Sequence, residues 1–277
     1  MKIDAHQHFW QYDPVAYQWI SDAMPMLKQD RLPEDLLPLL HAQGFDGCVA
    51  VQARQSEAET DFLLQLAAQH KEIKAVVGWV DLQGADLELR LQHYRQFPLL
   101  KGFRHIVQDE PDDHFLLRDA FIRGVALLHA FGFTYDILVY EKHLPTVIKF
   151  LEHFDNQPFV LDHIGKPDIK EPMKPSWRDA IFTLATYPNL YCKISGLVTE
   201  AHWQHWQVAD FQPFLEVVFE AFGADRLMIG SDWPVCLLAA PDYDAVIHLV
   251  ENFTKDLSPA DQAKVFGNNA AQFYNIQ

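Results

Sequence analysis

The chain has 277 residues, of which 49% are hydrophobic and 22% charged, a balance typical of a folded protein in water. Its formal net charge of −16 disfavours nucleic acids and anionic membrane surfaces as partners, because both are negatively charged. Cys48, Cys192 and Cys236 have no paired spacing, no apolar run approaches the roughly 20 residues of a membrane span, and no basic-then-apolar leader opens the chain. We therefore expect a cytoplasmic protein in a reducing compartment.

Short apolar runs recur along the chain and predict its strands. They cover residues 3–5, 46–52, 75–81, 100–105, 134–139, 159–163, 190–195 and 227–232. The runs are rich in Val and Ile and lack clean alternation, which is typical of strands buried on both faces of a parallel sheet.

Helical patterns separate these runs. Residues 144–151 carry apolar side chains at i, i+3, i+4 and i+7, as in an amphipathic helix. A helix over 33–43 is predicted to open on a first-turn proline and to end at Gly44, and Ser258 is predicted to cap the last helix. Eight strands alternating with helices predict a (β/α)8 TIM barrel, formed by residues 1–277 as a single domain.

A doubly wound open sheet is the competing architecture. It is disfavoured because no glycine-rich phosphate loop follows any of the runs. The segment 10–31 is longer than a usual connection from strand to helix, and it holds several aromatic residues. Long connections of this kind usually shape the functional site of a barrel.

Polar residues stand where the predicted strands end, at the edge where a barrel collects its chemistry. They are His6, His8, Gln52, Arg54, Asp81, Arg104, His105, Asp162, His163, Lys166, Lys193, Ser195, Ser231, Asp232 and Trp233. Asp81 is interpreted as a turn residue. Strand alternation favours His163 over Asp162 for the site, and Asp162 is then expected to face the helix layer.

Five motifs that contain many of these polar residues follow one another between residues 4 and 235. They are Asp4–Trp10 with its His-x-His pair, Lys101–His105, Leu161–Pro167, Lys193–Leu197 and Gly230–Val235. Together they resemble the lactonase branch of the amidohydrolase superfamily. The resemblance implies a barrel hydrolase that opens lactones, with His6, His8, His163 and Asp232 in its site.

The resemblance also indicates how many metal ions the site could hold. The chain has no clear lysine to bridge two metals, so it is expected to need no cofactor or to hold a single divalent metal weakly. The ligands of such a metal, for example Zn²⁺, would be His6, His8 and Asp232.

Ester cleavage by water needs a base for the water and positive potential on the carbonyl oxygen. Asp232 is predicted to be the base, and His6, His8 and His163 to supply the potential. The expected substrate-binding residues are cations that orient hydroxyl or carboxylate groups and tryptophans that stack on a sugar ring. They are Arg104, Arg54, Lys166, Trp10 and Trp233.

The leading hypothesis is therefore hydrolysis of a small sugar lactone, an aldonolactone such as L-fucono- or L-rhamnonolactone. Two alternatives stay open: a metal-dependent decarboxylase or other hydrolase of the same superfamily, and a sugar-acid binding protein without catalysis. The expected partner is a small-molecule lactone, without nucleic acid or membrane. The sequence does not decide between a monomer and a homo-oligomer.

Overall fold

The computed structural model describes residues 1–277 and contains one eight-stranded parallel sheet with the strand order β1 to β8. The strands are β1 (Ile3–Gln7), β2 (Gly47–Val51), β3 (Ile73–Gly78), β4 (Leu100–Ile106), β5 (Thr134–Leu138), β6 (Phe159–Leu161), β7 (Leu190–Ile194) and β8 (Leu227–Ile229). A parallel bridge between Gln7 and Trp233 joins the end of β1 to the residues after β8. The ring of strands is thereby completed, and the predicted (β/α)8 barrel is confirmed in place of an open sheet.

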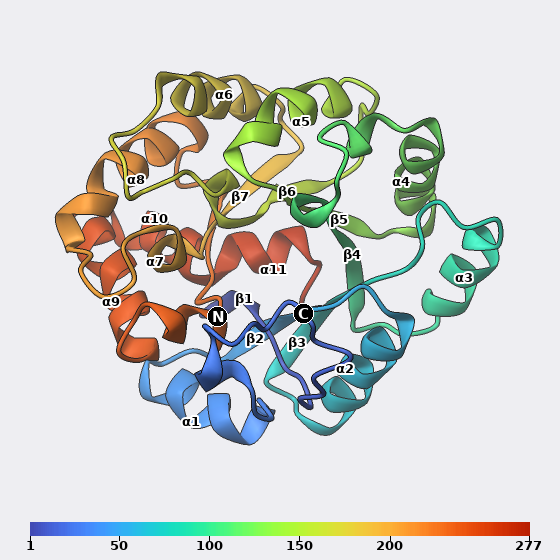
Figure 1. Ribbon diagram of the computed structural model, residues 1–277, viewed down its shortest axis with the longest axis horizontal. Coiled ribbons are helices and arrows are strands. Elements are labelled where there is room, and N and C mark those ends of the chain that lie inside the picture. The colour runs from blue at the N-terminus through green and yellow to red at the C-terminus, as the bar shows by residue number, and fades with distance from the viewer.

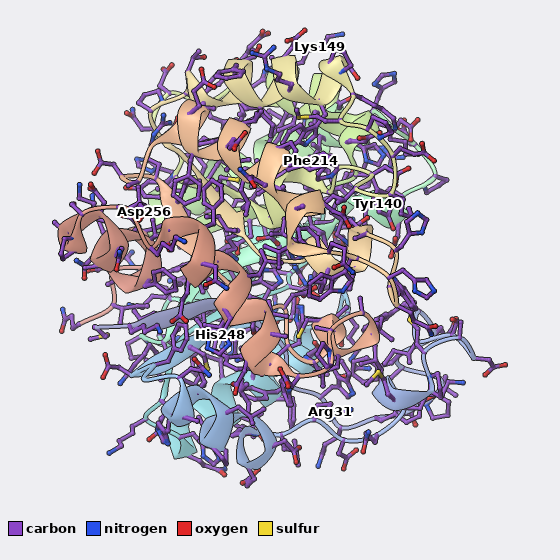
Figure 2. All side chains as sticks on the ribbon, turned by 90° about the vertical axis from the view of Figure 1, so that its left-hand side faces the viewer. Arg31, Tyr140, Lys149, Phe214, His248 and Asp256 are labelled. Atoms are coloured by element: carbon purple, nitrogen blue, oxygen red, sulfur yellow. The ribbon has the colours of Figure 1, made fainter.

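Helices surround the strands (Figure 1). They are α1 (Pro33–Ala42), α2 (Glu57–Gln69), α3 (Leu87–Tyr94), α4 (Asp119–Phe131), α5 (Leu144–Leu151), α6 (Pro175–Ala185), α7 (Leu197–Glu200), α8 (Val208–Phe222), α9 (Tyr243–Thr254), α10 (Pro259–Ala263) and α11 (Asn269–Phe273). Figure 2 shows that side chains fill the space between the strands and the outer helices. The main core is one cluster of 66 buried residues. No helix has the length and apolar character that a membrane span requires.

The predicted helix ends are confirmed where capping chemistry marks them. Pro33 is the first residue of α1, and Gly44 follows the helix with φ of 70°, a conformation that glycine adopts without steric cost. The hydroxyl of Ser258 accepts a hydrogen bond from the backbone N–H of Asp261 at the start of α10. All three cysteines are buried and free.

Three predicted strands, β3, β6 and β8, end two or three residues earlier than expected, and β8 ends at Ile229. β3 ends at Gly78, and Asp81 lies in the following turn, where its carboxylate accepts the N–H of Gln83. β6 ends at Leu161, and the next four residues form a 3-10 turn in which His163 has φ of 55°. Strand alternation therefore does not apply to residues 162 and 163. The expectation that Asp162 faces the helix layer is wrong, because Asp162 lies inside the barrel with His6 and Arg104.

Candidate active site

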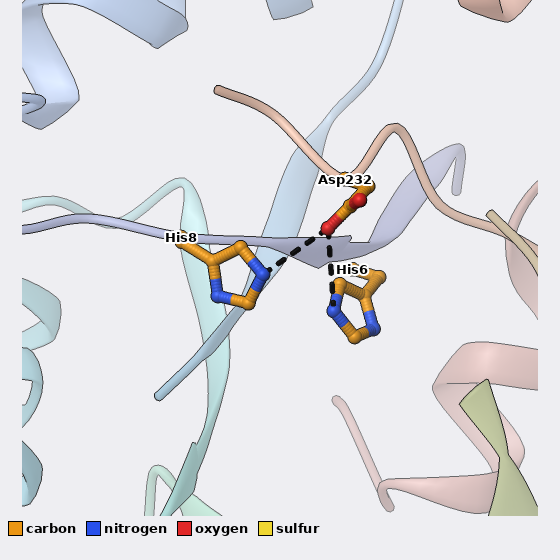
Figure 3. Close-up of side chains that lie close together, drawn as sticks. All are labelled: His6, His8 and Asp232. Carbon is orange, nitrogen blue, oxygen red and sulfur yellow. Dashed lines mark hydrogen bonds and ion pairs between the residues drawn. The ribbon is translucent and has the colours of Figure 1, made fainter. Parts of the chain in front are cut away.

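His6, His8 and Asp232 form the centre of the site at the ends of β1 and β8 (Figure 3). The Oδ1 atom of Asp232 lies 3.2 Å from Nε2 of His8 and 3.8 Å from Nε2 of His6. The two imidazole rings are 5.0 Å apart, centroid to centroid. All three side chains are almost fully buried, so they interact with little screening by water.

Backbone and carboxylate contacts hold Asp232 toward the histidines. Asp232 has φ of 58°, a conformation that costs a non-glycine residue stability unless its surroundings enforce it. Its N–H donates to the carbonyl of His6 over 2.8 Å. The carboxylate of Asp4 accepts both the N–H (2.9 Å) and the hydroxyl (2.6 Å) of Ser231. Asp4 thus ties the turn after β8 to β1, which explains the acidic residue two positions before the His-x-His pair.

The hydrogen bonds of the two histidines fix which ring nitrogens are free. Nδ1 of His8 lies 2.8 Å from the carbonyl oxygen of Val51, which only accepts, so Nδ1 carries the proton. Arg104 Nη1, which only donates, lies 3.2 Å from His6 Nε2. The proton of His6 is then on Nδ1, which lies 3.3 Å from Asp162 Oδ1 and also 3.2 Å from Lys193 Nζ, whose own protons are directed at Asp136 and Asp162. His6 and His8, each with a proton on Nδ1, therefore both direct Nε2 toward the carboxylate of Asp232.

Two imidazole lone pairs facing one carboxylate oxygen are a suitable donor set for a single divalent cation. Ligands about 2.0–2.1 Å from a tetrahedral Zn²⁺ lie roughly 3.4 Å from one another, close to the 3.2 and 3.8 Å observed here. Arg104 Nη1 shares the lone pair of His6 Nε2, so a cation bound there competes with the guanidinium. The residues thus fit one metal, and the guanidinium of Arg104 lies against one of the nitrogen atoms that would bind it.

His163 completes the set from the turn after β6. Its ring lies 4.4 Å from that of His6, and its Nδ1 is 2.9 Å from the hydroxyl of Ser195. Gly196 makes this approach feasible, because a Cβ atom at position 196 would lie 2.5 Å from His163 Nδ1. When Ser195 donates to Nδ1, Nε2 of His163 carries its proton and is a hydrogen-bond donor.

A buried ionic network lies beneath the histidines. Lys193 Nζ is 2.6 Å from Asp136 Oδ2 and 3.0 Å from Asp162 Oδ1, and Arg104 Nη1 is 3.0 Å from Asp162 Oδ2. The hydroxyl of Tyr274, just after α11, donates to Asp136 over 2.7 Å. Figure 1 shows α11 lying across the centre of the strand ring. Two cations and two carboxylates thus neutralise one another below His6.

The pKa values follow from this packing. Burial lowers the pKa of His163 to about 4, and it also holds the pKa of His6 well below its usual value, where Lys193 acts in the same direction. Burial alone would raise the pKa of Asp232, but the neighbouring histidines, His163 above all, outweigh it and lower this pKa. At neutral pH, Asp232 is an ionised carboxylate, and the imidazoles of His6 and His163 are neutral.

The site opens into a small pocket of about 220 Å³. Five of the predicted site residues line it: His8, Arg104, His163, Lys166 and Asp232. His6 lies just beneath it, against Asp232 and His163. The other lining residues are Trp19, Met24, Ala53, Ile106, Gln108, Asp109, Leu138, Tyr140 and Val235.

Three predicted substrate-binding residues do not line this pocket. Trp10 is fully buried beneath the segment 10–31, and its indole N–H donates to the carbonyl of Gln29. Trp233 is also buried, with its ring centroid 6.1 Å from that of Phe9. Arg54 pairs with the buried carboxylate of Glu59 over 3.0 Å. The expectation that these side chains contact substrate is corrected: the tryptophans pack in the protein, and Arg54 neutralises a buried acid.

Several residues of the ionic network and of the pocket lining were not predicted from the sequence as site residues. Asp136 and Tyr274 complete the ionic network, and Trp19, Gln108 and Tyr140 line the pocket. A buried partner for Asp136 could have been predicted from the sequence, since a charged residue inside an otherwise apolar strand needs one. Trp19 lies in the segment 10–31, whose length did predict a part in shaping the site, whereas nothing in the local sequence of Gln108 or Tyr140 distinguishes these residues from surface residues.

Comparisons with known proteins agree with this geometry. A family model described as amidohydrolase matches residues 3–276. The chain is 45% identical to an L-fucono-1,5-lactonase of Burkholderia multivorans, with 100% of this chain and 96% of the relative covered. It is 36% identical to an L-fucono-1,5-lactonase of Burkholderia ambifaria, with 99% and 96% covered. A crystal structure of an amidohydrolase from Burkholderia multivorans with bound Zn has a TM-score of 0.97 at 44% identity, covering 100% of both chains.

Proposed function

The chain belongs to the amidohydrolase family, and we propose that it hydrolyses a small, neutral sugar lactone. One observation carries the proposal: an ionised carboxylate, Asp232, faces three imidazoles in a small pocket, in a chain similar along its whole length to L-fucono-1,5-lactonases. The substrate class is an aldonolactone. The unit that acts is residues 1–277 as a single hydrolase domain, in the cytoplasm.

Asp232 is the general base of this proposal. It accepts a proton as water attacks the lactone carbonyl carbon, and the proton then passes to the ring oxygen when the bond between that oxygen and the carbonyl carbon breaks. A hydroxy acid results. The hydrogen bonds at Asp4 and Ser231 hold the carboxylate in place, so little reorganisation is needed as the water reacts.

Hydrogen-bond donors polarise the carbonyl. His163 Nε2–H is available when Ser195 donates to Nδ1. Nε of Arg104 is buried without a partner in a side chain that lines the pocket. A developing oxyanion near these groups gains stabilisation in a site with little water. A divalent metal held by His6, His8 and Asp232 would supply Lewis acidity at the same place.

We expect most of the lactonase activity to survive exhaustive chelation. A lactone is an activated ester, and protein donors already face the pocket, while Arg104 competes for His6 Nε2. Metal content by mass spectrometry and zinc affinity by calorimetry should show weak, substoichiometric binding in the same preparation. Complete loss of activity, restored by Zn²⁺ alone, would contradict this expectation.

We also expect neutral aldonolactones to be hydrolysed in preference to pyrone dicarboxylates. Both cationic lining residues are committed to carboxylates: Arg104 lies 3.0 Å from Asp162, and Lys166 lies 3.7 Å from Glu200. Asp232 and Asp109 add negative charge to the lining, which repels an anionic substrate. A pH-indicator screen of both classes tests this preference and the proposed function together. Turnover of a pyrone dicarboxylate with inert aldonolactones would overturn it.

A metal-dependent decarboxylase is the alternative within the superfamily. It has less support, because the relatives similar along the whole chain are named as lactonases. Release of CO₂ from aromatic carboxylic acids, abolished by chelation, would favour the alternative over lactone hydrolysis.

A further inference from the structure

Besides Arg104, two pocket residues present a buried polar atom that has no hydrogen-bond partner. They are Nε1 of Trp19 and Oε1 of Gln108. An unpaired buried donor or acceptor costs stability, and most such groups in proteins are paired. Both side chains line one small pocket, so a ligand bound there lies beside them.

The segment that carries Trp19 is anchored, so the direction of its indole N–H is fixed before a ligand arrives. Trp10 and Arg31 exchange backbone hydrogen bonds of 2.9 and 2.8 Å at the two ends of the segment. The ring of Trp19 packs edge-on against the ring of Trp10, with centroids 5.8 Å apart. Trp10 is in turn held by its hydrogen bond to the carbonyl of Gln29.

Gln108 lies in a 3-10 turn, Val107–Asp109, directly after β4. The same strand supplies Arg104, so the turn follows the strand that reaches the histidines. Ile106, the last residue of β4, donates its N–H to the side-chain oxygen of Gln55 over 2.8 Å. This contact ties the turn to the connection after β2 and fixes the backbone from which Gln108 extends.

Apart from the carboxylate of Asp109 and the hydroxyl of Tyr140, the remaining lining offers few groups that can hydrogen-bond a substrate hydroxyl. Met24, Ile106, Leu138 and Val235 present apolar atoms. Lys166 is drawn toward Glu200, and its ammonium group also lies 5.3 Å from the ring of Tyr140. Trp19 and Gln108 thus supply buried, uncommitted hydrogen-bonding atoms away from the reacting centre.

We propose that Trp19 and Gln108 select a hydroxylated lactone. The indole N–H of Trp19 donates to a ring hydroxyl oxygen, and the amide oxygen of Gln108 accepts a hydroxyl proton. A hydroxyl group both donates and accepts, so a polyol lactone satisfies both atoms. A lactone without hydroxyls leaves both unpaired, which is how a site built to bind an OH group rejects an analogue that lacks it. This inference rests on the proposed lactonase function.

The test compares two lactones with the same six-membered ring. L-fucono-1,5-lactone carries hydroxyl groups, and δ-valerolactone carries none. The variants are Trp19→Phe, Gln108→Leu and the double variant. We expect each single change to lower kcat/KM for the hydroxylated lactone by roughly 3- to 10-fold, the effect of losing one hydrogen bond. The rate with δ-valerolactone should stay within about twofold, because that substrate never made the bond.

Matched controls are available outside the pocket. Trp206→Phe removes an indole N–H that donates to the carbonyl of Ala239, and Gln212→Leu changes an exposed residue of α8. Both controls should leave the ratio of the two rates unchanged. A similar fall with both lactones in Gln108→Leu, or an unchanged ratio in both single variants, would overturn the inference. If Trp19→Phe alone disturbs the fold, Gln108→Leu decides the matter.

The outcomes also separate this inference from the function on which it rests. A parent enzyme that hydrolyses neither lactone contradicts the proposed function itself. A parent that hydrolyses both lactones equally well supports the function and contradicts the selection by Trp19 and Gln108.

Discussion

Asp232→Asn is expected to lower kcat for lactone hydrolysis by about 10²–10⁴-fold, the usual cost of losing a general base. The asparagine keeps the shape of the side chain and can still contact His8, which lies 3.2 Å from the carboxylate. It cannot accept a proton from water. Because Asp232 is ionised at neutral pH, the parent enzyme has its base in the active form over the whole neutral range.

The measurement is kcat on an aldonolactone, with circular dichroism to verify the fold. Asp179→Asn, a change at an exposed carboxylate of α6, is the matched control and should be without effect. A kcat for Asp232→Asn within threefold of the parent would exclude Asp232 as the base. The competing structural role, capping of the turn after β8, has little support, because the carboxylate is directed at His8 and His6.

The barrel could be predicted from sequence because strands and helices differ in period and length. Each of the eight apolar runs overlaps an observed strand. The histidines of β1 could be predicted for the same reason, since residues two apart on a strand share a side. The prediction fails at Asp162, where the chain leaves β6 after Leu161 and turns through residues with positive φ. Side chains in such a turn do not alternate between two faces, so strand periodicity cannot predict the direction of Asp162.

Aromatic residues near strand ends were harder to interpret. Trp10, Trp19 and Trp233 all lie in connections that follow barrel strands, yet only Trp19 lines the pocket. The difference arises from tertiary packing, because the segment 10–31 folds back on Trp10 and buries it. A partner distant in sequence, Arg31, therefore decides which indole remains available.

Lys193 shows that the environment of a charged residue, too, depends on tertiary packing that the local sequence does not predict. The sequence places it at the end of β7, where it could have faced solvent or substrate. The structure places it fully buried between Asp136 and Asp162, with Nζ 3.2 Å from His6 Nδ1. Its partners come from β5 and from the turn after β6, so the pairing exists only once the barrel has closed.

Lys193→Met is expected to destabilise the protein by about 3–5 kcal/mol, the usual cost of removing one partner from a buried ion pair. Burial already raises the pKa of Asp136 to about 6 beside Lys193, so without its nearest cation this carboxylate is left unpaired and must take up a proton. The free energy of unfolding by urea, followed by circular dichroism, measures the loss. Lys142→Met is the matched control: Lys142 pairs with Asp113 at a similar 2.7 Å but is 57% exposed. A surface pair of this kind contributes about 0–1 kcal/mol.

A second variant separates the destabilisation caused by the unpaired buried carboxylate from that caused by lost packing. Lys193→Met combined with Asp136→Asn removes the uncompensated carboxylate and still leaves an oxygen to accept the hydroxyl of Tyr274. Asp162 keeps Arg104 as its partner at 3.0 Å. The double variant should therefore be more stable than Lys193→Met alone, because the remaining groups are neutral or paired. If the two losses of stability simply add, or if Lys193→Met costs no more than Lys142→Met, the buried network does not stabilise the barrel beneath His6.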